Sequence, residues 1–288
     1  MNMADPLVKP ITTLAVDVHG HYGLYVDPHR DGSKTTNHWM TGDGPTVARR
    51  AAECGIEWTV VSPLLSLFPR GKAIAAKGND EAAAVVAATP GLRQWVVVNP
   101  LQPETYRQAE YMLTTPWCVG IKIHPEEHVY PIKEHGAALF EFAARHRTVV
   151  LTHSGEENSL PIDFIPFMDR FPEAKLILAH LGMGWNGDPT LQVRAIQASQ
   201  NGNVYTDTSS GRSVMSGLIE WAVSEIGSDR ILFGTDTPLY FAAMQRMRIE
   251  MAEIPEKDRL KILSENARHL LKLTATPAYA NGRTKASR

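Results

Sequence analysis

Leu14-Ala15-Val16-Asp17-Val18-His19-Gly20-His21 is an apolar run that closes on two histidines. Its hydrophobic residues predict a strand, in which successive side chains alternate between two faces. On such a strand His19 and His21 point the same way, with Asp17 one step before them. Two imidazoles side by side at a strand end are a good start on a binding site for a divalent metal ion.

Seven more short apolar runs follow, and segments with helical spacing separate them. The predicted strands are residues 12–18, 58–63, 94–99, 119–124, 148–153, 175–180, 204–208 and 230–236. The predicted helices are residues 44–54, 79–88, 103–113, 131–145, 161–171, 188–199, 213–226, 239–252 and 255–273. Alternation of strand and helix predicts an α/β fold with a parallel sheet, and eight such units predict a closed (β/α)8 TIM barrel.

The competing fold is a doubly wound open sheet, which often has a glycine-rich phosphate turn after its first strand. His-Gly-His-Tyr-Gly stands here instead, at residues 19–23. We expect a single barrel domain at residues 11–273, an N-terminal extension at residues 1–10 and a flexible tail at residues 274–288. A long loop with functional content follows the first strand at residues 22–42, and the last helix caps the barrel. The methionines within residues 244–251 have the spacing of core-facing helix positions.

The composition of the chain indicates which classes of partner it is not expected to bind. It has 288 residues, a net charge of −2 and 43% hydrophobic residues, which predicts a globular protein without a nucleic-acid or anionic membrane partner. No apolar run approaches the roughly 18 residues of a membrane span. Cys54 and Cys118 form no disulfide framework, and the first ten residues contain no apolar signal core. We therefore expect a cytoplasmic protein, and a homo-oligomer is compatible with this composition.

Five of the predicted strands end in histidine, lysine or aspartate. These residues are His19 and His21 of the first, Lys122 and His124 of the fourth, His153 of the fifth, His180 of the sixth and Asp236 of the eighth. In a (β/α)8 barrel the active site forms at the C-terminal ends of the strands. Alternation pairs His153 with Val149 and Leu151, His180 with Leu176 and Leu178, and Asp236 with Leu232 and Gly234. We expect the apolar or small members to fill the barrel and the polar ones to meet at its mouth.

The motifs HxH, GIKIHP, THSG, AHLG and ILFGTDTP occur in this order. Together they resemble the amidohydrolase superfamily, in its amidohydrolase-2 or amidohydrolase-related branch, over residues 12–271. The resemblance implies a (β/α)8 barrel and one or two divalent metal ions, with Zn²⁺ expected and Mn²⁺ as the alternative. It also implies hydrolysis, or in some relatives decarboxylation or hydration, of a small carboxylated molecule.

Residue by residue, the resemblance assigns metal binding to His19, His21, His153 and Asp236, and gives Asp236 a second role in handling the proton of an attacking water. His180 matches a residue that polarises substrate or shuttles protons in single-metal relatives and binds a second ion in two-metal relatives. The physics agrees, since neutral imidazoles and a carboxylate hold such an ion with one position open for water. Asp17 is expected to orient a ligand histidine.

The substrate-binding residues are open to more than one interpretation. Some relatives carry a carboxylated lysine at the end of the fourth strand, but we expect Lys122 to contact an anionic substrate unmodified or to lie buried behind the ligands. His124 either binds substrate or hydrogen-bonds to backbone. Arg70 and Arg212 follow the second and seventh strands and suit bidentate carboxylate binding, or are solvated loop charges. Tyr22 opens the long loop and is expected to face substrate.

The leading hypothesis is a metal-dependent hydrolase that acts on a small carboxylated amide, ester or lactone, because GIKIHP looks more like the hydrolytic relatives. The first alternative is a non-oxidative decarboxylase or a hydratase of a small aromatic or unsaturated carboxylic acid on the same scaffold. The second alternative is a metabolite-binding barrel without turnover, or a metal-free hydrolase. The ligand set alone does not separate these three.

Overall fold

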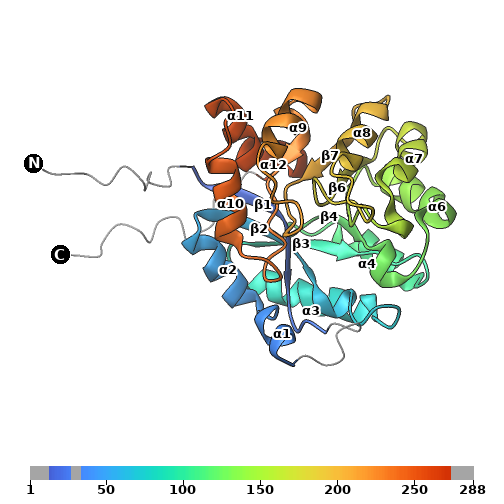
Figure 1. The fold of residues 1–288 in the computed structure, drawn as a ribbon. Helices are drawn as coiled ribbons and strands as arrows, with labels where there is room; N and C mark the ends of the chain where they lie inside the picture. The colour runs from blue at the N-terminus through green and yellow to red at the C-terminus, as the bar shows by residue number, and fades with distance from the viewer. Residues whose placement is uncertain (1–12, 27–33, 274–288) are drawn as a thin grey trace, which may run out of the picture.

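The computed structural model describes residues 13–26 and 34–273 and confirms the (β/α)8 barrel (Figure 1). The predicted N-terminal extension and C-terminal tail lie outside the described residues. Eight parallel strands follow one another around the sheet in chain order. They are β1 (Ala15–Tyr22), β2 (Ile56–Pro63), β3 (Leu92–Val97), β4 (Cys118–Ile123), β5 (Val149–Thr152), β6 (Lys175–Leu178), β7 (Val204–Asp207) and β8 (Ile231–Leu232).

Helices surround the strands on the outside of this barrel (Figure 1). The α-helices are α1 (Lys34–Trp39), α2 (Gly44–Glu53), α3 (Ala75–Ala88), α4 (Glu104–Met112), α5 (Pro125–His128), α6 (Ile132–Arg145), α7 (Ile165–Arg170), α8 (Leu191–Ala198), α9 (Leu218–Ile226), α10 (Ala242–Glu250), α11 (Glu256–Leu260) and α12 (Asn266–Leu271). Shorter helical turns lie at Leu64–Ser66, Glu157–Ser159, Pro161–Phe164, Ser228–Arg230 and Lys261–Glu265.

The barrel closes between its last and first strands although β8 itself has only two residues. Backbone bonds continue the closure past the end of β8. Val18 donates to the Phe233 carbonyl at 2.9 Å, Asp236 donates to the His19 carbonyl at 2.7 Å, and His21 donates to the Thr237 carbonyl at 2.6 Å. These bonds interleave the HxH stretch with residues 233–237, so the first and last predicted motifs lie side by side.

Local sequence explains how individual elements begin. Asp43 caps α2 by accepting the Thr46 N–H at 2.8 Å, and Pro45 suits the first helical turn because it has no N–H to satisfy there. The outer faces of the central strands pack on helices, as Leu176 and Leu178 do in a cluster with helix residues such as Met168. This burial of apolar area is the main contribution that holds the helices on the barrel.

The last helix packs as predicted, but α10 does not. Leu270 and Leu271 of α12 lie in one apolar cluster with Val16 of β1. The methionines within residues 244–251 were expected in the core, yet Met247 of α10 and Met251 just after it are 56% and 71% exposed. Helical spacing identifies one face of a helix without saying which face is buried, and α10 packs through Ala242 and Ile249 instead.

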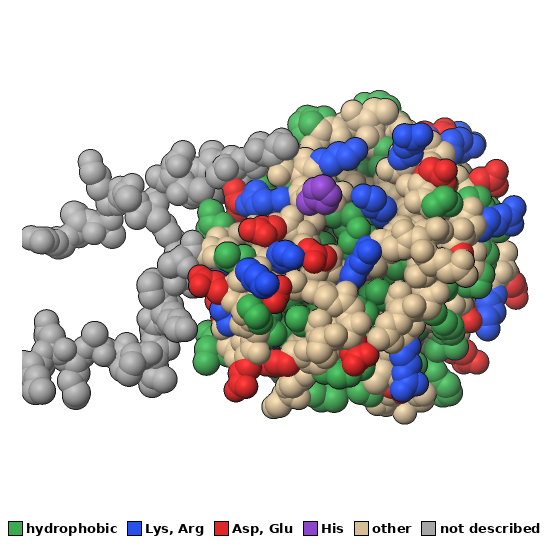
Figure 2. All heavy atoms as spheres, turned by 90° about the horizontal axis from the view of Figure 1, so that it is seen from above, with side chains coloured by type: hydrophobic (Ala, Val, Ile, Leu, Met, Phe, Trp, Pro, Cys, Tyr) green, Lys and Arg blue, Asp and Glu red, His purple; other side chains and the backbone are tan. Residues whose placement is uncertain are grey.

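The surface carries charges of both signs. On the face shown in Figure 2, basic side chains, acidic side chains and apolar side chains are interspersed. In the described part of the chain, no helix is both long enough and apolar enough to cross a membrane.

Candidate metal centre

His19 and His21 end β1 inside the barrel mouth, where both side chains are buried. An irregularity in the pairing of β1 with β2 lies between Asp17 and Gly20, so strict alternation is interrupted there. Gly20 separates the two histidines because a Cβ at this position would lie 2.5 Å from Thr59 Cγ2. The HxH motif is therefore a locally distorted strand end that only glycine allows at its centre.

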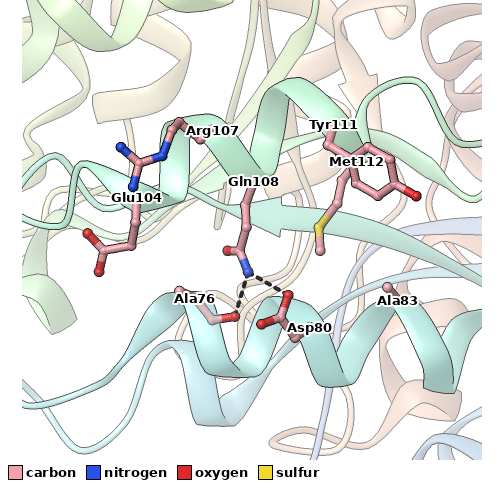
Figure 3. A pocket seen from close by; sticks show the side chains of 8 residues that line it. All are labelled: Ala76, Asp80, Ala83, Glu104, Arg107, Gln108, Tyr111 and Met112. Atoms are coloured by element: carbon pink, nitrogen blue, oxygen red, sulfur yellow. Dashed lines mark hydrogen bonds between the residues drawn. The ribbon is translucent and has the colours of Figure 1, made fainter.

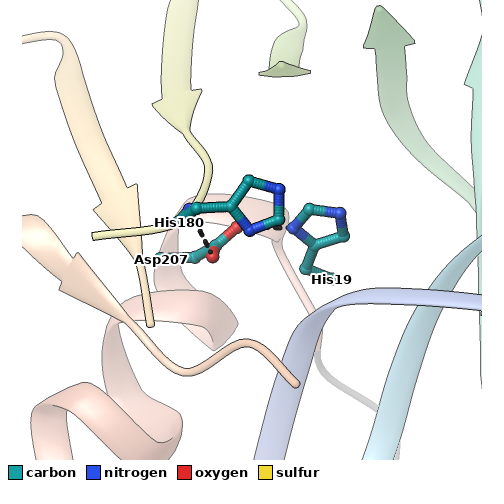
Figure 4. A group of neighbouring side chains, drawn as sticks. All are labelled: His19, His180 and Asp207. Atoms are coloured by element: carbon teal, nitrogen blue, oxygen red, sulfur yellow. Dashed lines mark hydrogen bonds and ion pairs between the residues drawn. The ribbon is translucent and has the colours of Figure 1, made fainter. Parts of the chain in front are cut away.

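The ring of His19 is oriented by Asp207 of β7 (Figure 4) and by Ser209 in the loop after it. Its Nδ1 lies 2.9 Å from Asp207 Oδ2 and 2.8 Å from Ser209 Oγ. Because a carboxylate oxygen only accepts hydrogen bonds, Nδ1 carries the hydrogen and Nε2 keeps its lone pair. Burial, followed by the nearby Lys122 ammonium, holds the pKa of His19 well below its usual value, so the ring is neutral as a ligand must be.

The ring of His21 is oriented in the same way from β2. Its Nδ1 lies 3.1 Å from the carbonyl oxygen of Ser62, so a ring with its hydrogen on Nδ1 donates there and offers Nε2 to a metal ion, whereas a hydrogen on Nε2 is donated to Asp236. That Nε2 is 3.0 Å from Asp236 Oδ1, and His19 Nε2 is 3.7 Å from the same oxygen. Donor atoms bound about 2.1 Å from one ion are separated by roughly 3.0–3.5 Å, so these three atoms fit a single divalent cation.

Asp236 follows β8 in the left-handed region, with φ of 58°. Burial alone would raise the pKa of its carboxyl group. The hydrogen bond from His21 is the largest of the causes that outweigh burial and hold the pKa well below its usual value. The carboxyl group is therefore ionised and available as a ligand or a base.

His180 reaches the same mouth by a route that alternation does not predict. Leu176 and Leu178 were expected to share its face, but they pack outward against helix residues, while Ile177 and Ala179 pack with the inner strand residues. His180 has φ of 70°, and this left-handed residue breaks the alternation just after β6. Its backbone N–H is held by Asp207 Oδ1 at 3.2 Å, so Asp207 positions both His19 and His180.

A second pair of donor atoms lies beside the first three. His180 Nδ1 donates to the Ser209 carbonyl oxygen, and His153 Nε2 lies 2.6 Å from Glu156 Oε2. The remaining nitrogens, His180 Nε2 and His153 Nδ1, face each other at 3.1 Å. Burial lowers the pKa of His180 to about 4, so its Nε2 offers a lone pair at neutral pH. Two facing lone pairs at this separation suit a cation or a shared proton.

Lys122 lies among the ligands, fully buried, with Nζ 2.9 Å from His19 Nε2. Desolvation lowers its pKa to about 8, while Asp236 and Asp207 act in the opposite direction. Its ammonium group donates to the very lone pair that a metal ion would use. Coordination by His19 therefore requires Lys122 to give up this hydrogen bond.

Two of the predicted substrate residues, Tyr22 and His124, occupy different environments. Tyr22 lies in an apolar cluster with Val47 of α2 and Ala82 of α3, because the residue after inward-facing His21 faces the helices. Its predicted substrate contact stays a prediction. His124 accepts the Glu127 N–H as the cap of α5, and its ring stacks on His153 at 4.4 Å. Both of its alternative roles stay open, because the cap uses only Nδ1.

The two predicted arginines differ in their partners. Arg70 Nη2 donates to Glu127 Oε1 at 2.8 Å, and this bond is the largest cause of its raised pKa. Arg212 is exposed, and its positive charge reaches Glu156. Substrate binding by either arginine stays a prediction.

The residues that orient the ligands were largely missed. Asp17 accepts the backbone N–H groups of His19 and Thr235 at 3.0 Å each, so it holds backbone rather than a ligand ring. Burial raises its pKa to about 8. Asp207 takes the orienting role, and its position at the end of the seventh predicted strand was the available signal.

A groove of about 510 Å³ lies elsewhere, between α3 and α4 (Figure 3). Its lining is Ala76, Asp80, Ala83, Glu104, Arg107, Gln108, Tyr111 and Met112. Gln108 bridges its two sides by donating to Asp80 at 2.7 Å and to the Ala76 carbonyl oxygen at 2.8 Å. None of the predicted ligands or substrate residues belongs to it.

The buried His128 of α5 predicts a pH-dependent stability. Its Nε2 lies 2.9 Å from the Ser66 carbonyl oxygen, and burial lowers its pKa from 6.5 to about 4. The unfolded chain binds the extra proton between these values, so stability falls as pH drops from 6.5 towards 4, by up to about 1.4 kcal/mol per pH unit for this residue. His128→Gln retains a donor for Ser66 but does not titrate, and urea unfolding across this range is expected to show a shallower decline. An equally steep decline in the variant would contradict the assignment.

Residues 70–273 match the amidohydrolase family. The chain belongs to this family. A curated relative, gamma-resorcylate decarboxylase of Polaromonas sp., is 38% identical over 120 residues. That match covers 36% of this chain and 36% of the relative, so it spans about a third of the relative's length.

Solved structures show the same fold as this amidohydrolase-family chain. They include 2,6-dihydroxybenzoate decarboxylase from Rhizobium, with a TM-score of 0.71 and 18% identity over 90% of this chain and 98% of that one. 5-Carboxyvanillate decarboxylase from Sphingomonas paucimobilis has a TM-score of 0.70 and 14% identity over 91% and 99%. Dihydroxybenzoic acid decarboxylase from Polaromonas sp., solved with bound manganese and 2-nitroresorcinol, has a TM-score of 0.69 and 19% identity over 90% and 97%. These names overturn the hydrolase expectation and favour its first alternative.

Proposed function

We propose that this chain is a metal-dependent non-oxidative decarboxylase of a small aromatic carboxylic acid. The observation that carries the proposal is the family match together with relatives that are named as aromatic-acid decarboxylases. The geometry is compatible with it, because the mouth of the barrel gathers the Asp236 carboxylate and the imidazoles of His19 and His21 around one buried point.

His19, His21 and Asp236 are the residues proposed to hold the metal ion, with His153 Nδ1 and His180 Nε2 as further donors. We propose Mn²⁺ in place of the expected Zn²⁺, since a relative of the same fold was solved with manganese. When bound, a divalent cation supplies a Lewis acid that binds and polarises an anionic oxygen of the substrate.

Decarboxylation replaces a carbon–carbon bond by a carbon–hydrogen bond, so one proton must reach the ring carbon as CO₂ leaves. Asp236 is ionised and His180 is neutral in this site, so each takes up a proton from solvent before it delivers that proton to the ring carbon. We assign proton transfer to these two residues. His124, Arg70 and Arg212 are proposed to contact the aromatic acid from the surrounding loops, and Lys122 is proposed as an unmodified positive charge beneath it.

The test is product analysis with defined probes. Protein loaded with Mn²⁺ is incubated with 2,6-dihydroxybenzoate and, separately, with 5-carboxyvanillate, and CO₂ and the decarboxylated arene are measured. We expect equimolar release of the two products from at least one probe, at least 100-fold above metal-depleted protein, and recovery when Mn²⁺ is restored. Equal rates with and without metal would contradict the proposed mechanism.

A further inference from the structure

Glu156 is an acidic residue outside the predicted ligand set that makes a direct contact with it. Its Oε2 lies 2.6 Å from His153 Nε2, three residues earlier in the chain. The side chain of His153 is 10% exposed and that of Glu156 is 31% exposed, so solvent only partly screens the pair.

The turn that carries Glu156 is fixed from several sides. Gly155 has φ of 104°, and a Cβ there would lie 2.3 Å from the Met183 carbonyl oxygen, so only glycine fits. The Gly155 N–H donates to the Ser159 carbonyl oxygen at 3.0 Å, and its own carbonyl accepts the Trp185 N–H at 2.7 Å. Glu156 therefore projects from a backbone whose conformation is determined by packing against the loop after β6.

A buried carboxylate from another loop anchors the far end of this turn. Glu126 of α5 accepts the backbone N–H of Asn158 at 2.7 Å and its side-chain amide at 3.0 Å. Glu126 thus ties the loop after β5 to the loop after β4. The residue that caps α5 is His124, whose ring stacks on His153 with an interplanar angle of 9°. The plane of the His153 ring is held by this stack, and its rotation within the plane by Glu156.

The charge of Glu156 is favourable where it lies. Its Oε2 is a carboxylate oxygen 2.6 Å from His153 Nε2, and the positive charges of Arg70 and Arg212 favour a negative charge there. A carboxylate oxygen only accepts hydrogen bonds, so His153 Nε2 carries the hydrogen of this contact. Nδ1 is then the nitrogen that faces His180 Nε2 at 3.1 Å.

We infer that Glu156 is the positioning residue of His153: it holds the hydrogen on Nε2 and turns the Nδ1 lone pair towards the metal centre. Histidine ligands generally donate their second ring N–H to such a carboxylate, and loss of that partner typically lowers metal affinity 10- to 100-fold. The inference rests on the metal centre of the proposed function. It adds Glu156 to the residues of that centre, and Glu156 is not among the polar residues predicted at the strand ends.

The experiment measures Mn²⁺ affinity by titration calorimetry, with no substrate present. Glu156→Ala is expected to weaken binding roughly 10- to 100-fold, and Glu156→Gln, which retains an acceptor oxygen without the charge, by a smaller factor. The matched control is Glu157→Gln, which removes the neighbouring exposed carboxylate and is expected to bind Mn²⁺ as the wild type does. Nitrogen NMR of the metal-free proteins is expected to show His153 with hydrogen on Nε2 in the wild type and a mixture of tautomers in Glu156→Ala.

The outcomes separate two failures. A wild-type protein that binds no Mn²⁺ would remove the metal centre of the proposed function. A wild type that binds Mn²⁺ as tightly as both Glu156 variants, with an unchanged His153 tautomer, would overturn the positioning role alone. If Glu156→Ala fails to fold, Glu156→Gln decides: affinity and NMR spectra equal to those of Glu157→Gln overturn the inference, and weaker binding with an altered His153 signal supports it.

Discussion

Asp236→Asn is expected to lower turnover of a decarboxylated probe by about 10³-fold or more while the barrel stays folded. The carboxylate has two tasks in the proposed site, as a metal ligand and as a group that transfers a proton, and transfer by a positioned side chain alone typically contributes 10²- to 10⁴-fold. Its Oδ1 lies 3.0 Å from His21 Nε2 and 3.7 Å from His19 Nε2, so replacing it alters the centre of the donor set.

Asparagine is the substitution that isolates this chemistry. Asp236 has φ of 58°, and asparagine tolerates the left-handed region better than other residues apart from glycine, whereas alanine would add backbone strain. The measurements are the rate of CO₂ release and the midpoint of thermal unfolding without metal. Asp229→Asn is the control, because it changes an aspartate whose side chain is 68% exposed. Wild-type turnover in Asp236→Asn would remove Asp236 from the mechanism.

Much of the barrel could be predicted from local patterns. Each of the eight predicted strands corresponds to a strand of the structure. This is because an apolar run rich in β-branched residues, set between amphipathic segments, is a signal that can be read from residues adjacent in the sequence. The family could also be predicted, because each of its motifs is a short stretch of consecutive residues. His153 also followed alternation, since Leu151 before it packs among the inner strand residues.

The remaining features depend on backbone conformation or on contacts between distant residues. His180 lies at the mouth, but the expected cause was wrong. Its left-handed backbone brings it there, whereas Leu178, expected on the same face of the strand, packs outward. Asp207 and His19 are 188 residues apart, and no local pattern pairs them. Hydrolysis was expected before decarboxylation because GIKIHP looks like the motif of the hydrolytic relatives, and that expectation was wrong. Both reactions use the same types of ligand, so the side chains of the site do not specify which bond is broken.

Asp207→Asn is expected to weaken Mn²⁺ binding by at least tenfold and to lower turnover 10²-fold or more, although Asp207 does not lie at the centre of the proposed ligands. One of its oxygens, Oδ1, accepts the backbone N–H groups of Ser209 at 2.9 Å and His180 at 3.2 Å. In Asp207→Asn, the side-chain amide oxygen is expected to take the place of Oδ1, because these two N–H groups need an acceptor. The amide NH₂ group then faces His19 Nδ1, where Asp207 Oδ2 now accepts at 2.9 Å.

A donor at that place reverses the tautomer of His19. Nδ1 must then accept, the hydrogen moves to Nε2, and the lone pair that would bind the metal ion is lost. Ser209→Ala is the matched variant, since it removes the other neighbour of His19 Nδ1, at 2.8 Å, but leaves the carboxylate in place. We expect Ser209→Ala to retain most of the Mn²⁺ affinity and the His19 tautomer, both read by calorimetry and nitrogen NMR. Equal affinities in Asp207→Asn and Ser209→Ala would show that the Asp207 carboxylate does not control the His19 ring.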